Sequence, residues 1–497
     1  MVTELEGVER IHLMGMGGAG MASLAKLLSG MGFQVSGCDL SRGESVQELE
    51  ALGMECLPGH SRDHVDRFDP QLLIYSSAVD EDCDELEAAR ARGVRTAGRG
   101  RALSWLFNAA SGVGVAGTHG KTTTSSMLSL VLSRAGLAPT LYVGARMRDM
   151  GTNALLGEGR LFLAELDESD GSFELFRPAV SIVTNVDWDH VDHFPSFEDV
   201  ILAFARFASG RKEGAPLIVC AEDEGAQRML EGLRGPLLRY GWGRSWDWGA
   251  FDLVPRATGG ISCSVCRKGK VLGPLELSVS GEHNVLNALA ALAAADVLGV
   301  PFEKAAATLK DFHGAARRLQ TKGTLGGVTV IDDYAHHPTE IAATLSALRG
   351  IYPNRRILLL YQPHRYTRTA ALVEPLTAAL SGADEILLLP IYSAGEPPQQ
   401  VSAEAIVERL RRAGKRIAFC RDEDDALRAV RALSQDGDLL LTMGAGNVFR
   451  VGERFLDGGT KSFPEGRSEG VPDGTRGRAC KDGEGRDGLR SGIRADS

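Results

Sequence analysis

The chain contains 497 residues, which is too many for one hydrophobic core and enough for about three domains. Hydrophobic residues make up 43% of it and the mean hydropathy is −0.08, as is usual for a soluble globular protein. The net charge of −10 excludes general binding to nucleic acid, which needs a basic stripe on the surface.

No targeting or membrane segment is visible in the sequence. The N-terminus is acidic and has no apolar signal-peptide region, and no run approaches about 18 consecutive apolar residues. We therefore expect a cytoplasmic protein without a membrane span. Of the eight cysteines only Cys263 and Cys266 have C-x-x-C spacing, and one such pair is a weak sign of zinc. We expect reduced thiols, and the sequence indicates no oligomeric state.

A glycine-rich turn near the N-terminus follows a predicted strand at residues 11–14. The turn reads G-M-G-G-A-G at 15–20, and a helix over 21–28 and a strand over 35–38 come next. That second strand ends at Asp39. This is the dinucleotide fingerprint G-x-G-x-x-G with an acidic residue about 20 positions later, which taken alone indicates NAD.

A further buried strand is predicted at residues 72–75 and ends at Ser76 and Ser77. Alternating strands and helices with these turns are typical of a Rossmann-like fold. We therefore predict a first α/β domain over residues 1–108.

A second glycine-rich turn, V-A-G-T-H-G-K-T-T-T at 115–124, lies between an apolar strand and a helical pattern. In a phosphate-binding loop, backbone N–H groups cradle the phosphates, Lys121 reaches the terminal ones and the Thr122 hydroxyl is placed for Mg²⁺. The stretch departs from the usual nucleotide loop at Val115, where glycine is usual. The alternative is a glycine-rich turn that merely caps an ordinary helix.

Acidic residues follow the next two predicted strands, at 161–164 and 180–183. The carboxylates at 165–170 can hold Mg²⁺ near phosphates, because Mg²⁺ prefers oxygen ligands; the alternative is a solvated acidic loop. The Asp- and His-rich run at 185–193 indicates metal or phosphate binding. Zinc and a solvated polar loop stay open as alternatives there.

The rest of the middle domain, predicted over residues 109–315, contains two further features. Residues 240–280 are predicted to form a small antiparallel excursion, and a helix is expected over 285–298. Asn284, in the run H-N-V-L-N before this helix, is either a simple N-cap or part of a group that reads a base edge.

The third domain, predicted over residues 316–460, is again α/β and doubly wound. Its predicted strands are 328–331, 357–360, 386–389 and 439–441. Arg317 and Arg318 lie at the entry to this domain, and polar motifs at 332–338 and 362–368 follow two of its strands. Paired Arg residues suit clamping of phosphate or carboxylate, and surface decoration is the alternative for any one of these motifs taken alone. Residues 461–497 have almost no apolar side chains and are predicted to be a disordered tail.

Two phosphate-type sites in one chain indicate a transfer or ligation reaction driven by ATP, with a nucleotide-linked second substrate. Two other classes stay open at this point. One is a dinucleotide-dependent oxidoreductase with an appended ATPase, and the other is a non-enzymatic ATP-driven switch.

Eight motifs occur in order across the three predicted domains. They are G-M-G-G-A-G-M at 15–21, G-T-H-G-K-T-T-T at 117–124, D-E-S-D-G-S-F at 167–173, N-V-D-W-D-H at 185–190, H-N-V-L-N-A-L at 283–289, R-R-L-Q at 317–320, D-D-Y-A-H-H-P-T-E at 332–340 and Q-P-H-R-Y-T-R-T at 362–369. The set resembles the ATP-dependent Mur ligases of bacterial cell-wall synthesis. Glu282 stands where that family usually has Arg, and Leu166 and Leu319 replace a small residue and Phe. Residues 191–210 contain no Lys, so the carbamylated lysine of some sister ligases is not expected.

The resemblance implies a reaction and its ligands. ATP phosphorylates the lactyl carboxylate of UDP-N-acetylmuramate, and the amine of L-alanine attacks the acyl phosphate, with Mg²⁺ required. H-H-P-T-E together with Q-P-H-R-Y-T-R-T indicates addition of the first amino acid rather than of a recycled peptide. Glycine and L-serine stay open as alternatives, because one methylene is worth only about 1–3 kcal/mol of discrimination.

The resemblance also implies roles for residues. The catalytic set is Lys121, Glu168, His190, Arg318, Asp333, His336 and Arg368. The ATP-binding set is Gly117, Thr118, His119, Gly120, Lys121, Thr122, Thr123, His283, Asn287, Arg318 and Asp333. The UDP-sugar-binding set is Gly15, Gly17, Gly18, Gly20, Asp39, Ser76, Ser77, Arg365 and Arg368. The Mg²⁺ ligands are Thr122, Glu168 and His190.

Overall fold

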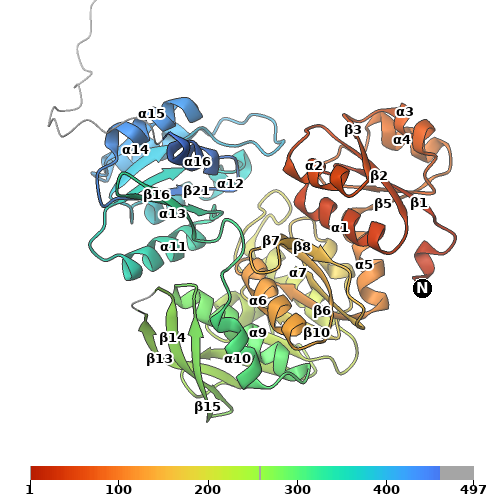
Figure 1. Cartoon of the computed structure of the whole chain (residues 1–497), viewed down its shortest axis with the longest axis horizontal. Coiled ribbons are helices and arrows are strands. Elements are labelled where there is room, and N and C mark those ends of the chain that lie inside the picture. The colour runs from red at the N-terminus through yellow and green to blue at the C-terminus, as the bar shows by residue number, and fades with distance from the viewer. Residues whose placement is uncertain (1, 257–258, 459–497) are drawn as a thin grey trace, which may run out of the picture. The chain divides into compact units, whose positions relative to one another are not determined.

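Three β-sheets follow one another along the chain in this computed structural model, which describes residues 2–256 and 259–458 (Figure 1). Most neighbouring strands are parallel, and helices pack on both faces of each sheet. The predicted α/β class with three domains is therefore confirmed. The predicted tail, residues 461–497, lies outside the described residues. Within the described ranges, no helix combines the length and apolar character needed to cross a membrane.

The first sheet contains five parallel strands in the order β3-β2-β1-β4-β5. Its strands are β1 (Arg10–Met14), β2 (Gln34–Asp39), β3 (Glu55–Pro58), β4 (Leu72–Tyr75) and β5 (Arg95–Gly98). Its helices are η1 (Thr3–Leu5), α1 (Ala19–Gly30), α2 (Glu44–Ala51), α3 (Arg62–Phe68), α4 (Asp84–Ala91) and α5 (Arg99–Ala109). The sequence predicts β1, β2 and β4. It does not predict β3 and β5, which are short and mostly exposed or half-buried.

The side chains of β1 alternate between the two faces of this sheet, as they must in any strand. Ile11 and Leu13 pack in a core with residues of α1 and α5, whereas Met14 packs with residues of α3 and α4 on the other face. His12 lies on the same face as Met14 and is fully buried.

The middle sheet contains ten strands in the order β15-β14-β13-β12-β11-β10-β6-β9-β7-β8. Its strands are β6 (Ser111–Ala116), β7 (Thr140–Met147), β8 (Thr152–Leu155), β9 (Leu161–Glu165), β10 (Val180–Val183), β11 (Leu217–Cys220), β12 (Leu237–Trp242), β13 (Trp248–Pro255), β14 (Ile261–Arg267) and β15 (Lys270–Leu277). Its helices are α6 (Lys121–Arg134), η2 (Ser172–Leu175), α7 (Phe197–Ser209), α8 (Glu224–Met229), α9 (Glu282–Val297) and α10 (Phe302–Lys310).

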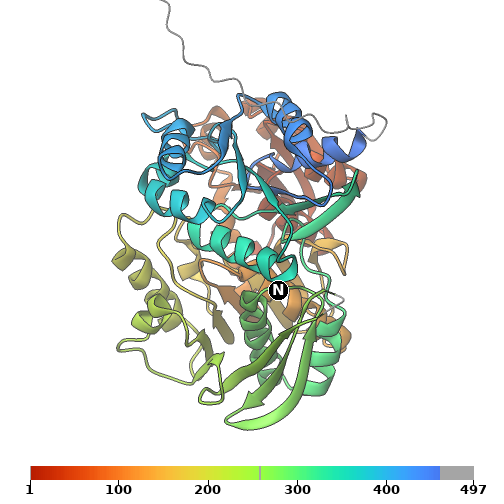
Figure 2. The same cartoon turned by 90° about the vertical axis from the view of Figure 1, so that its left-hand side faces the viewer.

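The predicted antiparallel excursion is confirmed for β13, β14 and β15, which form the long green ribbon at the bottom of Figure 2. It is not a separate unit, because β12 pairs with β13 in parallel and so continues the main sheet. Cys263 and Cys266 are buried free thiols on β14. Neither belongs to a group of potential metal ligands among the described residues.

Three parallel strands of this sheet bring the predicted ATP motifs together. β6 lies between β9 and β10, with Val115 opposite Glu165 and Ala116 opposite Val183. The loops that follow these strands therefore leave the same edge of the sheet, where ligands usually bind in α/β folds.

The third sheet has the order β16-β17-β21-β18-β19-β20, and only β16 is antiparallel. Its strands are β16 (Gln320–Leu325), β17 (Val328–Asp333), β18 (Ile357–Tyr361), β19 (Glu385–Leu388), β20 (Ile417–Phe419) and β21 (Leu439–Met443). Its helices are α11 (Pro338–Ile351), α12 (Tyr366–Ala371), α13 (Val373–Leu380), α14 (Ala403–Arg412), α15 (Glu423–Leu433) and α16 (Phe449–Asp457). The four predicted strands are confirmed, and their polar motifs follow the ends of β17 and β18.

Candidate functional site

The loop between β6 and α6 depends on two glycines. Gly117 has φ +132° and Gly120 has φ +80°, in the left-handed region that side chains rarely adopt. A Cβ atom on Gly117 would lie 2.0 Å from Oγ1 of Thr184, and one on Gly120 would lie 2.4 Å from Oδ1 of Asn287. The loop is thus pressed against both the end of β10 and the start of α9.

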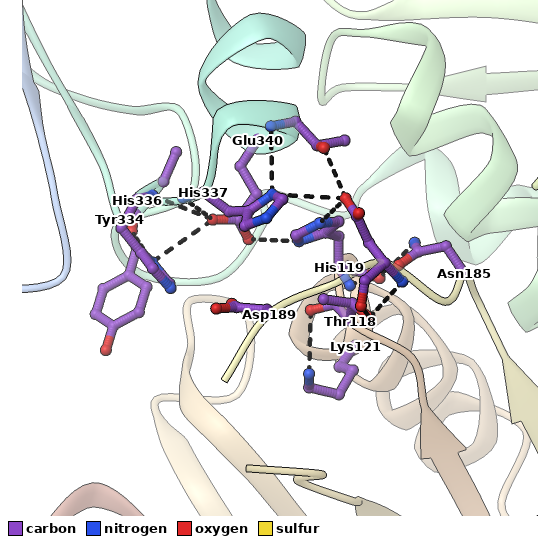
Figure 3. Close-up of polar contacts among 12 residues, drawn as sticks. Thr118, His119, Lys121, Asn185, Asp189, Tyr334, His336, His337 and Glu340 are labelled. Atoms are coloured by element: carbon purple, nitrogen blue, oxygen red, sulfur yellow. Dashed lines mark hydrogen bonds and ion pairs between the residues drawn. The ribbon is translucent and has the colours of Figure 1, made fainter. Parts of the chain in front are cut away.

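The polar run after β10 braces this loop (Figure 3). Oδ1 of Asn185 accepts a hydrogen bond from the backbone N–H of His119 at 2.7 Å, and Oγ1 of Thr184 donates to the carbonyl of His119 at 2.6 Å. The N–H of Asp187 donates to Oγ1 of Thr118 at 2.9 Å. These bonds tie the run to the loop, which argues against a solvated polar loop.

Lys121, the first residue of α6, is paired with Glu168. Its Nζ lies 2.7 Å from Oε2 of Glu168, and it also donates to the carbonyls of Gly117 at 2.6 Å and Thr118 at 3.1 Å. Glu168 is only 1% exposed, so the alternative of a solvated acidic loop is wrong at this position. Burial lowers the pKa of Lys121, but the neighbouring Glu168 and Asp167 outweigh it and raise that pKa.

Candidate Mg²⁺ ligands gather beside this pair. Oγ1 of Thr122 donates to Oε1 of Glu165 at 2.8 Å, and Oε2 of Glu165 accepts from the N–H of Gly144 at 2.6 Å. Nε2 of His190 lies 3.6 Å from Oε1 of Glu168. Hydroxyl and carboxylate oxygens suit Mg²⁺. The sequence prediction includes Glu165 in the acidic stretch but does not name it as a ligand.

A cavity of about 270 Å³ opens next to the loop and is lined by residues of both the middle and the third domain. Seven residues of the predicted ATP-binding set line it: His119, Gly120, Thr123, His283, Asn287, Arg318 and Asp333. Further lining residues that the sequence does not single out include Cys220, Glu222, Asp223, Tyr240, Ala343 and Thr344. The predicted residues Gly117, Thr118, Lys121 and Thr122 lie in the adjoining loop and the first turn of α6.

The first two turns of α9 present the amides of Asn284 and Asn287 to this cavity. Asn287 accepts a hydrogen bond from Oγ1 of Thr124 at 3.3 Å and donates to Oδ1 of Asn284 at 3.2 Å. The alternative that Asn284 is a simple N-cap is wrong, because the N-cap residue is Gly281. Burial, and then the nearby Arg318, lower the pKa of His283 to about 4, so this imidazole is neutral at pH 7.

The third domain contributes Arg318, Asp333 and Glu340. Nη1 of Arg318 lies 3.7 Å from Oε1 of Glu340. The carboxylate of Asp333 accepts from the N–H groups of Leu319 and Ala335, both at 2.8 Å, and so ties the end of β17 to the residue before β16. Burial raises the pKa of Asp333 to about 6.

His119 joins the loop of the middle domain to helix α11 of the third. Its Nε2 lies 3.0 Å from Oδ2 of Asp187, and its Nδ1 lies 3.4 Å from Oε1 of Glu340. Its ring packs against that of His337 with the centroids 4.7 Å apart. Burial lowers the pKa of His119, but the hydrogen bonds and charges of the two carboxylates raise it to about 9.

We expect this shift to make stability depend on pH. Because the folded pKa is raised from its usual 6.5 to about 9, the stabilisation is fully present below pH 6.5 and is lost as the pH rises through about 9. The loss amounts to at most about 3 kcal/mol. Urea unfolding at pH values across this range should show a decrease in the free energy of unfolding of the wild type. This decrease should be absent in His119→Gln. Buried thiols also titrate at alkaline pH, so the quantity to measure is the difference in unfolding free energy between the two proteins at each pH. Equal dependence of the unfolding free energy on pH in both proteins would contradict the prediction.

Two arginines on or next to α12 pair with the Asp-rich run of the middle domain. Arg368 is 3% exposed and makes two bonds to Asp189, Nε to Oδ1 at 2.7 Å and Nη2 to Oδ2 at 3.1 Å. Its Nη1 lies 2.8 Å from Nδ1 of His364. Arg365 pairs with Asp192 at 2.5 Å in a more exposed position. Both arginines therefore already have carboxylate partners.

His336 lies in the same region. Its Nδ1–H donates to the carbonyl of Tyr334 at 3.0 Å (Figure 3). Burial, and then the charge of Arg368, lower the pKa of His336 to about 4, so the ring is neutral at pH 7 and Nε2 keeps its lone pair. This atom can accept a proton or a hydrogen bond.

The glycine turn of the first domain is held by β2. The N–H groups of Gly15 and Met16 both donate to the carbonyl of Cys38, at 2.9 and 3.0 Å. Oδ2 of Asp39 accepts from the N–H of Gly17 at 2.8 Å. Asp39 therefore braces the turn from within, and the N–H of Gly17 is already occupied.

The other predicted UDP-sugar residues surround the same turn. Gly18 is the N-cap residue of α1, and a Cβ atom on Gly20 would lie 2.8 Å from both Nη1 of Arg99 and the hydroxyl of Tyr142. Ser76 packs against Gly15, and Ser77 is exposed. Among the described residues, no hydrogen bond or ion pair joins this turn to Arg365 or Arg368, so the predicted set falls into two groups.

Comparison with known proteins identifies the class of protein that this fold and site define. The Mur ligase family catalytic domain matches residues 10–111, the Mur ligase middle domain matches residues 115–295, and the Mur ligase glutamate ligase domain matches residues 317–446. The chain belongs to the Mur ligase family.

Relatives similar to this chain include a UDP-N-acetylmuramate–L-alanine ligase of Geobacter sp. (strain M21), which is 41% identical over 452 residues. The alignment covers 90% of this chain and 97% of that one. The crystal structure of UDP-N-acetylmuramate–alanine ligase from Thermotoga maritima superposes with a TM-score of 0.77 at 28% identity, covering 90% and 98% of the two chains. A murein peptide ligase from Psychrobacter arcticus superposes with a TM-score of 0.71 at 25% identity, covering 92% and 100%.

Proposed function

We propose that this chain joins L-alanine to the lactyl carboxylate of UDP-N-acetylmuramate, converting ATP to ADP and phosphate. One observation carries the proposal: the phosphate-binding loop and charged groups of the third domain line one cavity of about 270 Å³, and the candidate Mg²⁺ ligand Thr122 lies beside it in the first turn of α6. The relatives that share the fold over nine-tenths of the chain and carry this activity in their names support the choice of substrates.

The loop and Lys121 hold the phosphates of ATP. Backbone N–H groups at the start of α6 are directed at anions, and the positive end of the helix dipole favours them. Nζ of Lys121 exchanges its bond with Glu168 for the β- and γ-phosphates when ATP binds. His283 and Asn287 lie on the adenine side of the cavity, and Arg318 and Asp333 complete it from the third domain.

The residues beside the loop fit Mg²⁺. Thr122, Glu168 and His190 form the proposed ligand set, and Glu165 adds a carboxylate that is already bonded to the hydroxyl of Thr122. Bound Mg²⁺ would neutralise charge on the transferred phosphoryl group. Glu168 is free to act as a ligand once Lys121 has moved to the phosphates.

The first step makes an acyl phosphate, because a carboxylate oxygen is a poor leaving group until it is phosphorylated. The step needs positioning and charge neutralisation more than covalent help from the protein. Arg365, Arg368 and His336 would orient the muramyl carboxylate or the incoming amine, and the neutral imidazole of His336 can accept the proton that the amine releases. The first-domain turn would hold the UDP diphosphate. We place the enzyme in the cytoplasm, where ATP is available.

Phosphate release from Mg²⁺-ATP tests this proposal. We expect release to require both UDP-N-acetylmuramate and L-alanine, with the joined product visible by mass spectrometry. Glycine, L-serine and the L-alanyl tripeptide serve as alternative amines. Release that is indifferent to any amine would leave an ATPase and contradict the proposal, and preference for the tripeptide would favour the peptide-recycling ligase. Tight NAD binding without ligation would favour the oxidoreductase class.

A further inference from the structure

A second group of metal-binding side chains is buried in the first domain, in a different sheet from the phosphate-binding loop. It consists of His12 on β1, Cys38 on β2, His64 on α3 and Glu85 on α4. One potential ligand atom of each lies within 4.8 Å of all the others. These residues are far apart in the sequence, and the doubly wound fold brings them together under α3 and α4.

Glu85 lies at the centre of this group. Its Oε1 is 2.8 Å from Nε2 of His12, and its Oε2 is 3.0 Å from Nδ1 of His64 and 3.4 Å from Sγ of Cys38. The ligands of a tetrahedral zinc ion are roughly 3.3–3.6 Å apart. The Cys38–Glu85 separation falls within this range, whereas the His12–Glu85 and His64–Glu85 separations are about 0.3–0.8 Å shorter and would open as the ion enters between them.

The nitrogen of His12 that faces the group lacks an aligned partner. His12 is fully buried, and its Nε2 makes no hydrogen bond despite its distance of 2.8 Å from Glu85. The other ring nitrogen, Nδ1, lies 2.9 Å from Oγ of Ser36. With the proton on Nδ1 bonded to Ser36, the lone pair of Nε2 is directed into the group, as in a histidine that binds a metal.

The charge of the group suits a divalent cation. A buried carboxylate is costly unless it is paired. Two neutral imidazoles, the carboxylate and the thiolate that Cys38 would form on binding a metal have a total charge of −2. One Zn²⁺ ion would make the buried group neutral. The donor set of two nitrogens, one sulfur and one oxygen favours zinc over Mg²⁺, which prefers oxygen.

We propose that His12, Cys38, His64 and Glu85 bind one Zn²⁺ ion with a structural role in the first domain. His60, whose Nδ1 lies 3.1 Å from Sγ of Cys38, is placed to support the thiolate from outside the ligand set. All four ligands come from the protein and are buried, as in a structural site without an open position for substrate.

The site would also stiffen the glycine turn. The carbonyl of Cys38 accepts the N–H groups of Gly15 and Met16, and the next residue, Asp39, accepts that of Gly17. A metal bound through Sγ of Cys38 would fix the end of β2, on which the turn depends. The zinc site itself does not rest on the proposed ligase function.

Metal content of the full-length protein tests the inference. We expect the purified wild type to keep one zinc ion per chain through dialysis, and the cobalt-substituted protein to show a near-ultraviolet thiolate-to-cobalt charge-transfer band. Cys38→Ser and His64→Gln should each lose the bound metal, a larger effect than the 10–100-fold loss of affinity expected when a residue outside the ligand set is removed. Cys38→Ser should also lose the band.

Two matched variants serve as controls. Cys56 lies on β3, the strand next to β2, and His313 is exposed. The variants Cys56→Ser and His313→Gln should both keep the metal and the band. A wild type that binds neither zinc nor cobalt would overturn the inference, as would a band that survives Cys38→Ser. Circular dichroism checks that each variant folds. If Cys38→Ser does not fold, the charge-transfer band of the wild type and the metal content of His64→Gln test the zinc site. These readouts do not use ligase activity, so they can fail independently of the proposed function.

Discussion

Replacing Lys121 with alanine is expected to lower kcat/KM for phosphate release by about a thousandfold, because it removes a preorganised positive charge from the transferred phosphoryl group. The same change has a structural cost. Glu168, 1% exposed and 2.7 Å from Nζ of Lys121, would be left without its partner, and such a loss typically costs about 3–5 kcal/mol. Initial rates at saturating amine and varied ATP provide the measurement.

A double variant separates these two effects. Lys121→Ala with Glu168→Gln leaves no unpaired buried charge, so its melting temperature should recover while its activity stays low. Lys310→Ala is the surface control, since this lysine is 55% exposed and pairs with Glu276 in the same domain. Activity that recovers together with stability in the double variant would remove Lys121 from the proposed phosphate site.

Arg368→Ala is expected to destabilise the contact between the middle and third domains by about 3–5 kcal/mol. The guanidinium makes two bonds to Asp189, both groups are nearly buried, and the variant would leave the carboxylate without its partner. Urea unfolding can be followed by the fluorescence of Trp188, which packs against apolar residues of the third domain as well as those of the middle domain.

Arg365→Ala provides the matched control, because it lies three residues earlier and pairs with Asp192 of the same run. Its side chain is 29% exposed and that of Asp192 is 38% exposed, so water screens the pair and the expected loss is below about 1 kcal/mol. Similar losses of unfolding free energy in the two variants would contradict the inference that the buried Arg368–Asp189 pair stabilises the contact between the middle and third domains. A double variant with Asp189→Ala should recover part of the stability lost in Arg368→Ala.

Local patterns determined most of the fold. Strands such as β4, β18 and β21 are continuous apolar runs bounded by polar residues, and such a run has few alternatives to a buried strand. No such run marks the strands at the edges of the first and third sheets, which are β3, β5, β16 and β20. Their residues are largely exposed or half-buried, so these strands do not need to be apolar. Their pairing depends on neighbouring strands, which the sequence pattern does not reveal.

The loop before α6, which is part of the candidate site, could also be predicted from a local sequence pattern. Glycines at 117 and 120 next to Lys121 and Thr122 form a contiguous motif, and a phosphate-binding loop is a local structure. The partners of these residues were not visible. Nothing in the sequence indicates that Lys121 contacts Glu168 rather than Glu165, because the two carboxylates are only three positions apart.

By itself, then, the sequence determined the α/β class with three domains, the glycine-rich loop before α6 and the polar motifs that follow the strands. The tertiary structure alone decided which charged groups meet: His119 with Glu340, Arg368 with Asp189, and His12 with Glu85. The physical reason is distance along the chain. Backbone preferences and apolar periodicity act over a few residues, whereas a buried charge is stabilised by whichever opposite charge the packing of distant elements places beside it.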